Sequence, residues 1–191
     1  MDYPFPKTWW IDPRKILGGC YPGCLDRRKS LQMLESLIAF NVRVIINLQQ
    51  RGETNDAGKP FADYSGPVRS IAARTGDVVE LHSFPVTDMT PPTPDQMTQI
   101  QAVLRQAVDA GKLAYVHCWG GHGRTGTVGG CWLVAQGFTP AQAIELMQKQ
   151  RTHDPGCRRQ NAPQTPDQRN FIADWAASHA PAPTASTRLR Q

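Results

Sequence analysis

Short apolar runs that suit buried β-strands alternate along this chain with amphipathic helical patterns, and this alternation limits the fold more than any other feature. Strands are predicted at residues 42–48, 78–86 and 113–117, where β-branched and aromatic residues cluster. Apolar residues at helical spacing lie between and after these runs. Strands that are joined through helices form mainly parallel sheets with helices packed against them. The chain is therefore predicted to be an α/β protein.

Several predicted helices carry recognisable end signals. Thr93 with Pro94, and Thr139 with Pro140, pair an N-cap hydroxyl with proline at the first helical position. The last helix is expected from about residue 165 to residue 177, and the first twenty-odd residues are expected to add an edge strand or a hairpin. Asparagine or glycine marks the ends of three helices, at Asn41, Gly111 and Gly137.

Length and charge suit an ordinary globular domain. The chain has 191 residues, and a single domain over residues 1–178 is long enough to bury a core without disulfides or metals. Residues 179–191 are rich in Pro, Ala and Thr, so we expect a disordered tail there. Lys and Arg number 21 against 16 Asp and Glu, which gives a net charge of +5. This excess suits an anionic substrate and equally a solvated basic surface, but no basic tract with interleaved aromatic residues indicates nucleic acid as a partner.

Cysteine usage points to a reducing compartment. The five cysteines are odd in number and irregular in spacing, and the N-terminus has no apolar signal segment. The longest apolar runs are far too short for a membrane span. We therefore expect a cytoplasmic protein with free thiols. Whether Cys20, Cys24 or Cys157 pairs with Cys118 under oxidation stays open.

The most informative segment is residues 116–126, Val-His-Cys-Trp-Gly-Gly-His-Gly-Arg-Thr-Gly, which follows a predicted strand and begins a predicted helix. At such a junction, unpaired backbone N–H groups and the helix dipole favour the thiolate form of Cys118 and create an anion-binding nest. Arg124 brings a planar fork suited to two phosphate oxygens. Thr125 can donate its hydroxyl to the thiolate, and His117 can orient the loop. Three glycines free the backbone to turn its N–H groups inward: Gly120, Gly121 and Gly123.

Other interpretations explain less of this segment. Its G-x-G-x-x-G spacing from residue 121 matches a dinucleotide site, but the acidic residue about 20 positions further on, Glu145, lies in a helical pattern. The chain has no G-x4-G-K-[ST] motif, which excludes a P-loop NTPase. If Cys118 were only a buried structural cysteine, the arginine and the glycines would stay unexplained. Cys131, by contrast, is expected to be a buried core cysteine. A zinc site with Cys118 and His122 lacks further ligands at recognisable spacing.

A thiolate that displaces an alkoxide or phenoxide needs an acid to protonate the leaving oxygen. Asp88 lies in the segment 84–92, which leaves a predicted strand and enters a loop bounded by prolines. A turn aspartate is the alternative for this residue. Asp95 is a rival acid, although its place in the first turn of a helix favours capping or dipole complementarity.

The sequence His-Cys-x5-Arg-Thr-Gly resembles the signature loop of the protein tyrosine phosphatase superfamily, and HCWGGHGRTG is especially similar to the loops of dual-specificity and kinase-associated phosphatases. Residues 84–92 resemble the general-acid loop of these relatives, and 164–171 resemble the Q-loop. The resemblance implies a central, mainly parallel sheet of four or five strands flanked by helices on both faces. It implies the catalytic residues Cys118, Arg124, Asp88 and Gln164. The substrate-binding residues that it implies are Trp119, Gly120, Gly121, His122, Gly123, Arg124, Thr125 and Gln168, with His117 in support.

The implied activity is metal-independent hydrolysis of phosphate monoesters on phosphoproteins, through a phosphocysteine intermediate and without a cofactor. Phosphotyrosine is the first expected substrate, with phosphoserine and phosphothreonine beside it. Phosphoinositides, inositol phosphates, RNA 5′ ends and a phosphate-binding pseudophosphatase are the alternatives. No tyrosine-recognition loop is evident: Arg51, Glu53 and Tyr64 are expected to be solvated rim residues. His122 could add charge at mildly acidic pH, which keeps inositol phosphates open.

Overall fold

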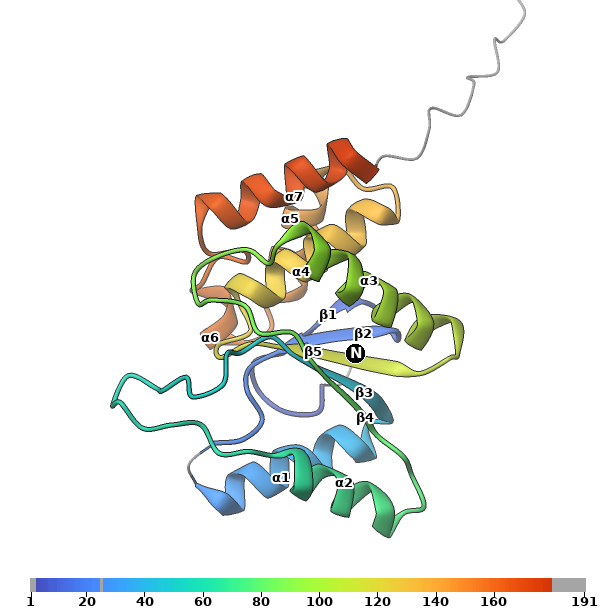
Figure 1. The fold of residues 1–191 in the computed structure, drawn as a ribbon, viewed down its shortest axis with the longest axis vertical. Helices are drawn as coiled ribbons and strands as arrows, with labels where there is room; N and C mark the ends of the chain where they lie inside the picture. The colour runs from blue at the N-terminus through green and yellow to red at the C-terminus, as the bar shows by residue number, and fades with distance from the viewer. Residues whose placement is uncertain (1–2, 25, 180–191) are drawn as a thin grey trace, which may run out of the picture.

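A five-stranded sheet in the order β1-β2-β5-β3-β4 lies at the centre of the computed structural model, which describes residues 3–24 and 26–179 (Figure 1). β1 and β2 form an antiparallel hairpin, and all other neighbouring strands are parallel. The predicted α/β fold is confirmed, and the N-terminal hairpin supplies one edge of the sheet. The strands are β1 (Thr8–Asp12), β2 (Ile16–Gly19), β3 (Val42–Asn47), β4 (Glu80–Ser83) and β5 (Leu113–His117).

Helices cover both faces of the sheet (Figure 1). One face carries α1 (Arg27–Ala39) and α2 (Ser65–Arg74). The short helix α6 (Pro155–Arg158) precedes the last helix. Neither α2 nor α6 is predicted by the patterns above. The opposite face carries α3 (Pro94–Asp109), α4 (Gly123–Ala135), α5 (Pro140–Gln150) and α7 (Pro166–His179).

The core has two halves because successive strand residues point to opposite faces of a sheet. Trp9 and Val116 belong to the half that also contains α3 and α4 side chains, together with Cys118. Trp10, which follows Trp9 on β1, and Tyr115, which precedes Val116 on β5, belong to the other half, under α1 and α2. The thiol therefore emerges from the side of the sheet that α4 covers.

Most of the predicted helix ends are confirmed. Thr93 and Thr139 both form capping boxes with the glutamine three residues later. Two predictions are corrected: β4 is shorter than the expected strand at 78–86, and α7 includes His179, which the sequence placed in the tail. The rest of that tail, 180–191, lies outside the described residues. The residues that follow three helices have left-handed backbones, with φ of 69° at Asn41, 67° at Gly111 and 97° at Gly137.

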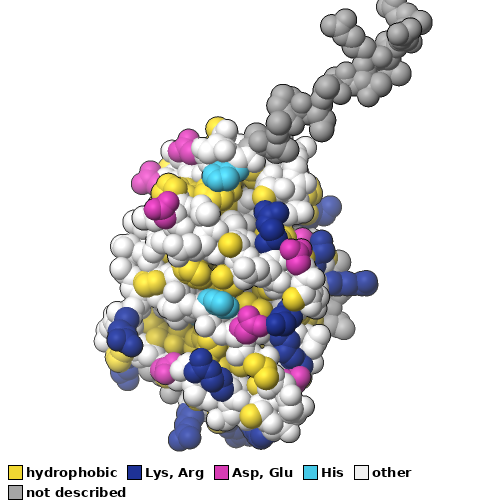
Figure 2. Space-filling view, turned by 45° about the vertical axis from the view of Figure 1, so that its right-hand side comes forward, with side chains coloured by type: hydrophobic (Ala, Val, Ile, Leu, Met, Phe, Trp, Pro, Cys, Tyr) yellow, Lys and Arg dark blue, Asp and Glu magenta, His cyan; other side chains and the backbone are white. Residues whose placement is uncertain are grey.

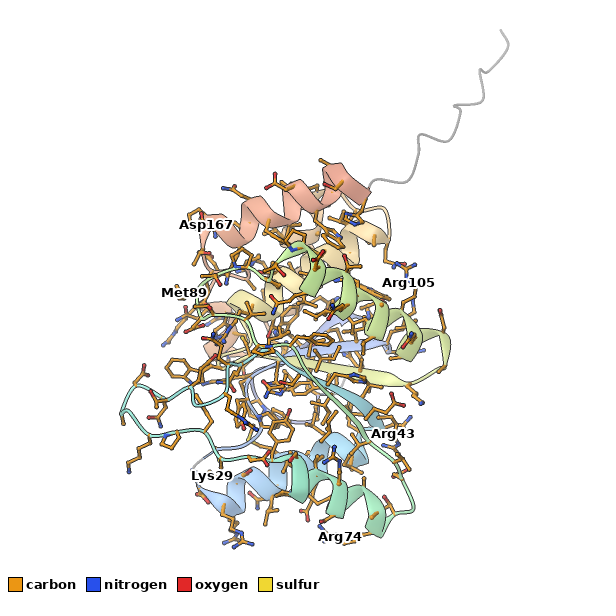
Figure 3. The ribbon with its side chains drawn as sticks, viewed as in Figure 1. Lys29, Arg43, Arg74, Met89, Arg105 and Asp167 are labelled. Atoms are coloured by element: carbon orange, nitrogen blue, oxygen red, sulfur yellow. The ribbon has the colours of Figure 1, made fainter. Side chains whose placement is uncertain are left out.

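All four parallel strands end on the same side, so the segments that follow β2, β3, β4 and β5 meet there. Met89, from the loop after β4, and Asp167, from the start of α7, both lie on this side (Figure 3). Charged side chains are interspersed on the face seen in Figure 2, without one continuous basic patch. Among residues 3–24 and 26–179, none of the helices combines the length and the apolar character that a membrane span requires.

Candidate active site

The loop of residues 118–122 connects the end of β5 to the start of α4 and carries the predicted nucleophile. Cys118 is only 3% exposed, and the Thr125 hydroxyl donates to its Sγ over 3.2 Å. Thr125 lies in the first turn of α4, where backbone N–H groups have no partner within the helix. The thiol is thus held at the positive end of a helix that is buried along most of its length.

Two glycines allow the loop its tight course. Gly121 has a left-handed backbone with φ of 75°, and a Cβ there would lie 2.8 Å from the backbone nitrogen of Cys20. A Cβ on Gly123 would lie 2.7 Å from Oε1 of Gln164. A side chain at residue 121 would displace the backbone that follows β2, and one at residue 123 would displace the glutamine amides, so the glycine pattern has a steric cause.

The hairpin and the segment after it hold the loop from the outside. Trp9 Nε1 donates to the carbonyl oxygen of Gly121 over 3.2 Å, and the Tyr21 backbone N–H donates to the carbonyl oxygen of Trp119 over 2.8 Å. The second bond continues the β2–β5 ladder one step beyond the strands. Consequently two backbone carbonyls of the loop point away from its centre.

Arg124 is 1% exposed and is oriented by acceptors on two other loops. Glu53 accepts from both Nη1 and Nη2, the latter over 3.1 Å, and the Val86 carbonyl accepts from Nη1 over 3.0 Å. Nη2 also lies 2.8 Å from Oδ1 of Asp88. Burial lowers the pKa of Arg124, but Glu53, Cys118 and Asp88 outweigh it and raise the pKa overall.

One donor of this guanidinium is left over. Nε of Arg124 is buried and has no hydrogen-bond partner among the described residues. A buried unpaired donor of a charged group costs free energy, which a bound anion would recover. Arg124 thus combines a fixed orientation with an N–H that is available to a ligand.

Two residues expected to be solvated rim residues lie at the site instead. Glu53 has a 15% exposed side chain and is held by the Gln50 backbone N–H over 2.7 Å as well as by Arg124. Burial raises the pKa of Glu53, yet the hydrogen bonds from Arg124 and its neighbours lower it overall. Tyr64 is 5% exposed and bonds His117. Only Arg51 is exposed as expected.

His117 supports the loop from below in a defined tautomer. Its Nδ1 lies 3.2 Å from the carbonyl oxygen of Cys118, which can only accept, so Nδ1 carries the proton. Nε2 therefore accepts the Tyr64 hydroxyl over 2.7 Å. Burial lowers the pKa of His117 to about 3, so the ring is neutral at physiological pH.

His122 is held by a second buried arginine. Arg151 is fully buried, donates from Nη2 to Nδ1 of His122, and lies with its guanidinium carbon 5.5 Å from the centroid of the Trp9 ring. Its Nη1 donates to Oε1 of Gln148 over 2.7 Å. Burial and the charge of Arg151 lower the pKa of His122 to about 4. The expectation that His122 adds charge at mildly acidic pH is therefore wrong.

The Asp88 loop and the predicted Q-loop are tied to each other. Thr165 Oγ1 donates to the carbonyl oxygen of Met89 over 3.2 Å, and Nε2 of Gln168 donates to that of Thr90 over 3.2 Å. Met89 has a left-handed backbone with φ of 63°, which turns the chain directly after Asp88. The rival Asp95 lies exposed in the first turn of α3.

Gln164 and Gln168 differ in their access to a ligand. Gln168 is fully buried, and its Oε1 accepts the backbone N–H groups of Gln164 and Thr165 over 3.1 and 3.2 Å. Both ends of its amide thus hydrogen-bond backbone groups, and its contact with substrate stays a prediction. Gln164 is half-buried, and its amide, like that of Gln168, lies against Gly123 at the start of α4.

The remaining cysteines form no disulfide. All five are free, and Cys131 is fully buried in the core, as expected. Burial raises the pKa of Cys20 to about 12 and that of Cys157 to about 11. In residues 3–24 and 26–179, no three His, Cys, Asp or Glu side chains come together as a metal site would require.

A parallel sheet whose central strand ends in a cysteine at a helix N-terminus, with a buried arginine six residues later, defines a protein of the tyrosine phosphatase superfamily. The family model described as Swiss Army Knife protein, DSP-PTPase phosphatase domain, matches residues 7–169. The chain belongs to this family of dual-specificity-type phosphatase domains.

Curated relatives match over part of their length. Protein tyrosine phosphatase domain-containing protein 1 of Bos taurus is 30% identical over 120 residues, which are 62% of this chain and 15% of the relative. The protein of the same name from Mus musculus is 29% identical over 146 residues, or 76% of this chain and 19% of the relative. The chain thus spans less than a fifth of these relatives.

Solved structures share the fold over nearly the whole chain. PTPMT1 in complex with PI(5)P has a TM-score of 0.69 and 21% identity, and the match covers 91% of this chain and 96% of the PTPMT1 chain. Tk-PTP in its active form has a TM-score of 0.67 and 23% identity, with 91% and 98% covered. Kinase associated phosphatase has a TM-score of 0.67 and 20% identity, with 92% and 96% covered.

Proposed function

We propose that this protein hydrolyses phosphate monoesters of phosphoproteins, phosphotyrosine above all, with Cys118 as the nucleophile and without a metal. The observation that carries this proposal is the surroundings of Arg124. Its buried, unpartnered Nε belongs to the same guanidinium that contacts Asp88, six residues after a buried thiol at a helix N-terminus. A hydrogen-bond donor for an anion, a nucleophile and a carboxylate thus lie close together.

In the first step, the Cys118 thiolate attacks phosphorus while the bond from phosphorus to the ester oxygen breaks. Asp88 gives a proton to the departing oxygen. Arg124 and the N–H groups of residues 119–124 bind the three equatorial oxygens, whose charge increases in the transition state. The hydroxyl of Thr125, 3.2 Å from Sγ, stabilises the thiolate before attack.

In the second step, water attacks the phosphorus of phosphocysteine and the sulfur–phosphorus bond breaks. Asp88, now a carboxylate, takes a proton from this water, and the thiolate of Cys118 leaves. Gln164 orients the water, because an amide can both donate to phosphate and accept from water. The tie between the Asp88 loop and the segment of Gln164 supports this pairing of roles.

Other residues act as supports in this proposal. Glu53 fixes the fork of Arg124, and Gln168 fixes the backbone around Gln164 rather than the phosphate. Tyr64 and the neutral His117 fix the carbonyl of Cys118. The neutral state of His122 also removes the charge-based reason to favour inositol phosphates.

The test is a panel of phosphotyrosine, phosphoserine and phosphothreonine peptides, phosphoinositides and a 5′-phosphorylated RNA, assayed with EDTA present. We expect hydrolysis of phosphopeptides, inhibition by vanadate and no turnover by Cys118→Ser, which should still bind phosphate. Cys24→Ser, compared on a small aryl phosphate, serves as the matched control, since the Cys24 thiol donates to the carbonyl oxygen of Asp26 over 3.1 Å in its own loop. A purely binding protein would show no turnover with any substrate, and hydrolysis that depends on a divalent cation would contradict this mechanism.

A further inference from the structure

We propose that a groove beside the phosphate loop binds residues that flank the phosphorylated residue of a peptide substrate and that it selects an acidic side chain there. This inference rests on the proposed phosphatase function. The groove has a volume of about 740 Å³ and begins at Trp119 and Gly120, directly after the nucleophile. We call it the lysine–aromatic groove after the side chains that line it and carry the argument: Phe5, Lys7, Tyr21, Lys29, Phe61 and Trp119.

One wall of the groove is an aromatic cluster fixed to the phosphate loop. Phe61 packs edge-on against Trp119 with ring centroids 5.8 Å apart, and Tyr21 packs against Phe61 at 4.9 Å. The Tyr21 hydroxyl donates to the carbonyl oxygen of Ala62 over 2.6 Å, and its backbone N–H donates to that of Trp119. This wall is therefore in place before a ligand arrives, which lowers the entropic cost of binding.

The charged side chains that line the groove are both lysines, and no carboxylate lines it. Lys7 makes no ion pair with any described residue, and the nearest carboxylate to Lys29 is Asp26, 3.9 Å away with both side chains largely exposed. The backbone N–H of Lys7 donates to Oδ2 of Asp154 over 3.0 Å, which fixes the place from which its side chain extends. One lysine without an ion pair and one with only a long, exposed ion pair favour an anionic occupant.

Reach and chemistry favour a peptide. Neighbouring residues of an extended chain are about 3.3–3.6 Å apart, so residues one to three positions from a phosphorylated residue on Cys118 reach the groove. Lys29, at the start of α1, lies on the same side of the molecule as Met89 (Figure 3). An acidic side chain can place its methylene groups on Phe61 and Trp119 and its carboxylate near a lysine. A membrane surface would instead call for a broad basic patch.

The experiment compares two phosphotyrosine peptides that differ only in glutamate against glutamine at the three positions on each side. For the unaltered protein we expect a higher kcat/KM on the glutamate peptide, by roughly tenfold at low salt. The double variant Lys7→Met and Lys29→Met should reduce this ratio to near one. The charge-matched control, Lys15→Met with Lys112→Met, should keep it, because these lysines directly precede the parallel strands β2 and β5 and so lie at the opposite end of the sheet.

A small aryl phosphate separates the groove from the chemistry. Both double variants should hydrolyse it at the unaltered rate, since neither pair of lysines belongs to the proposed catalytic machinery. If the unaltered protein hydrolyses neither peptide nor aryl phosphate, the proposed function fails. If it hydrolyses both but shows no glutamate preference, or if both double variants keep the preference, the groove proposal is refuted. Loss of phosphoinositide-vesicle hydrolysis in the Lys7 and Lys29 variant, with an unchanged peptide ratio, would refute it in favour of a lipid surface.

Discussion

Replacing Glu53 with glutamine tests how strongly the position of Arg124 depends on a carboxylate from a distant loop. Glu53 accepts from two nitrogens of this guanidinium, from the Gln50 backbone and from the Gln49 amide. Glutamine keeps the size of the side chain but removes the charge and turns an NH2 group toward donors. Because Arg124 is 1% exposed, the change leaves a buried cation short of its main counter-charge.

The magnitude follows from this burial. Breaking a buried ion pair costs about 3–5 kcal/mol. The Asp88 carboxylate still contacts Arg124, but its side chain is 47% exposed and compensates only in part. We therefore expect the free energy of unfolding to fall by about 2–3 kcal/mol. On an aryl phosphate, kcat/KM should fall about 10- to 100-fold, because a displaced fork no longer matches the transition state.

Urea denaturation and steady-state kinetics measure both effects. Glu35→Gln is the matched control, because Glu35 pairs with Arg74 over 3.4 Å on the surface and should lose less than about 1 kcal/mol. Added phosphate should restore part of the stability of the Glu53 variant. An unfolding free energy and a kcat/KM equal to those of the unaltered protein would show that Arg124 holds its place without Glu53.

Asp88→Asn should lower kcat/KM on phosphotyrosine peptides by about 10²–10⁴-fold and much less on a nitrophenyl phosphate, whose leaving group needs no acid. Equal losses on both substrates would mean that Asp88 only shapes its loop. Asp95→Asn tests whether Asp95 is the general acid instead. The folded protein holds the pKa of His117 near 3, below the unfolded value of about 6.5, so its contribution to stability is lost as pH falls below 6.5. Between pH 7 and pH 5, the loss in unfolding free energy measured with urea should be about 2 kcal/mol smaller in His117→Asn than in the unaltered protein, because His122, whose pKa is also lowered, still contributes in both. Arg151→Met should raise the pKa of His122 from about 4, measured by NMR of the imidazole, and an unchanged titration would exclude Arg151 as a cause.

Features that depend on local chemistry could be predicted from the amino-acid sequence. Caps at Thr93 and Thr139, left-handed ends at Asn41, Gly111 and Gly137, and the strand of residues 113–117 all follow from short-range patterns. The cysteine-to-arginine loop is equally local, since its strand, glycines and helix start lie within eleven consecutive residues. These features need no distant partner to be recognised.

The distant residues that complete the site could be identified only from the folded structure. Glu53 meets Arg124 across 71 positions, and Tyr64 meets His117 across 53. Both residues lie in a polar segment with no periodicity, which is why the sequence indicated solvated rim residues there. The charge state of His122 depends on burial and on Arg151, 29 positions away. Long-range packing sets the electrostatics of each of these groups, because a side chain acquires its dielectric surroundings and its hydrogen-bond partners only when the sheet and helices assemble.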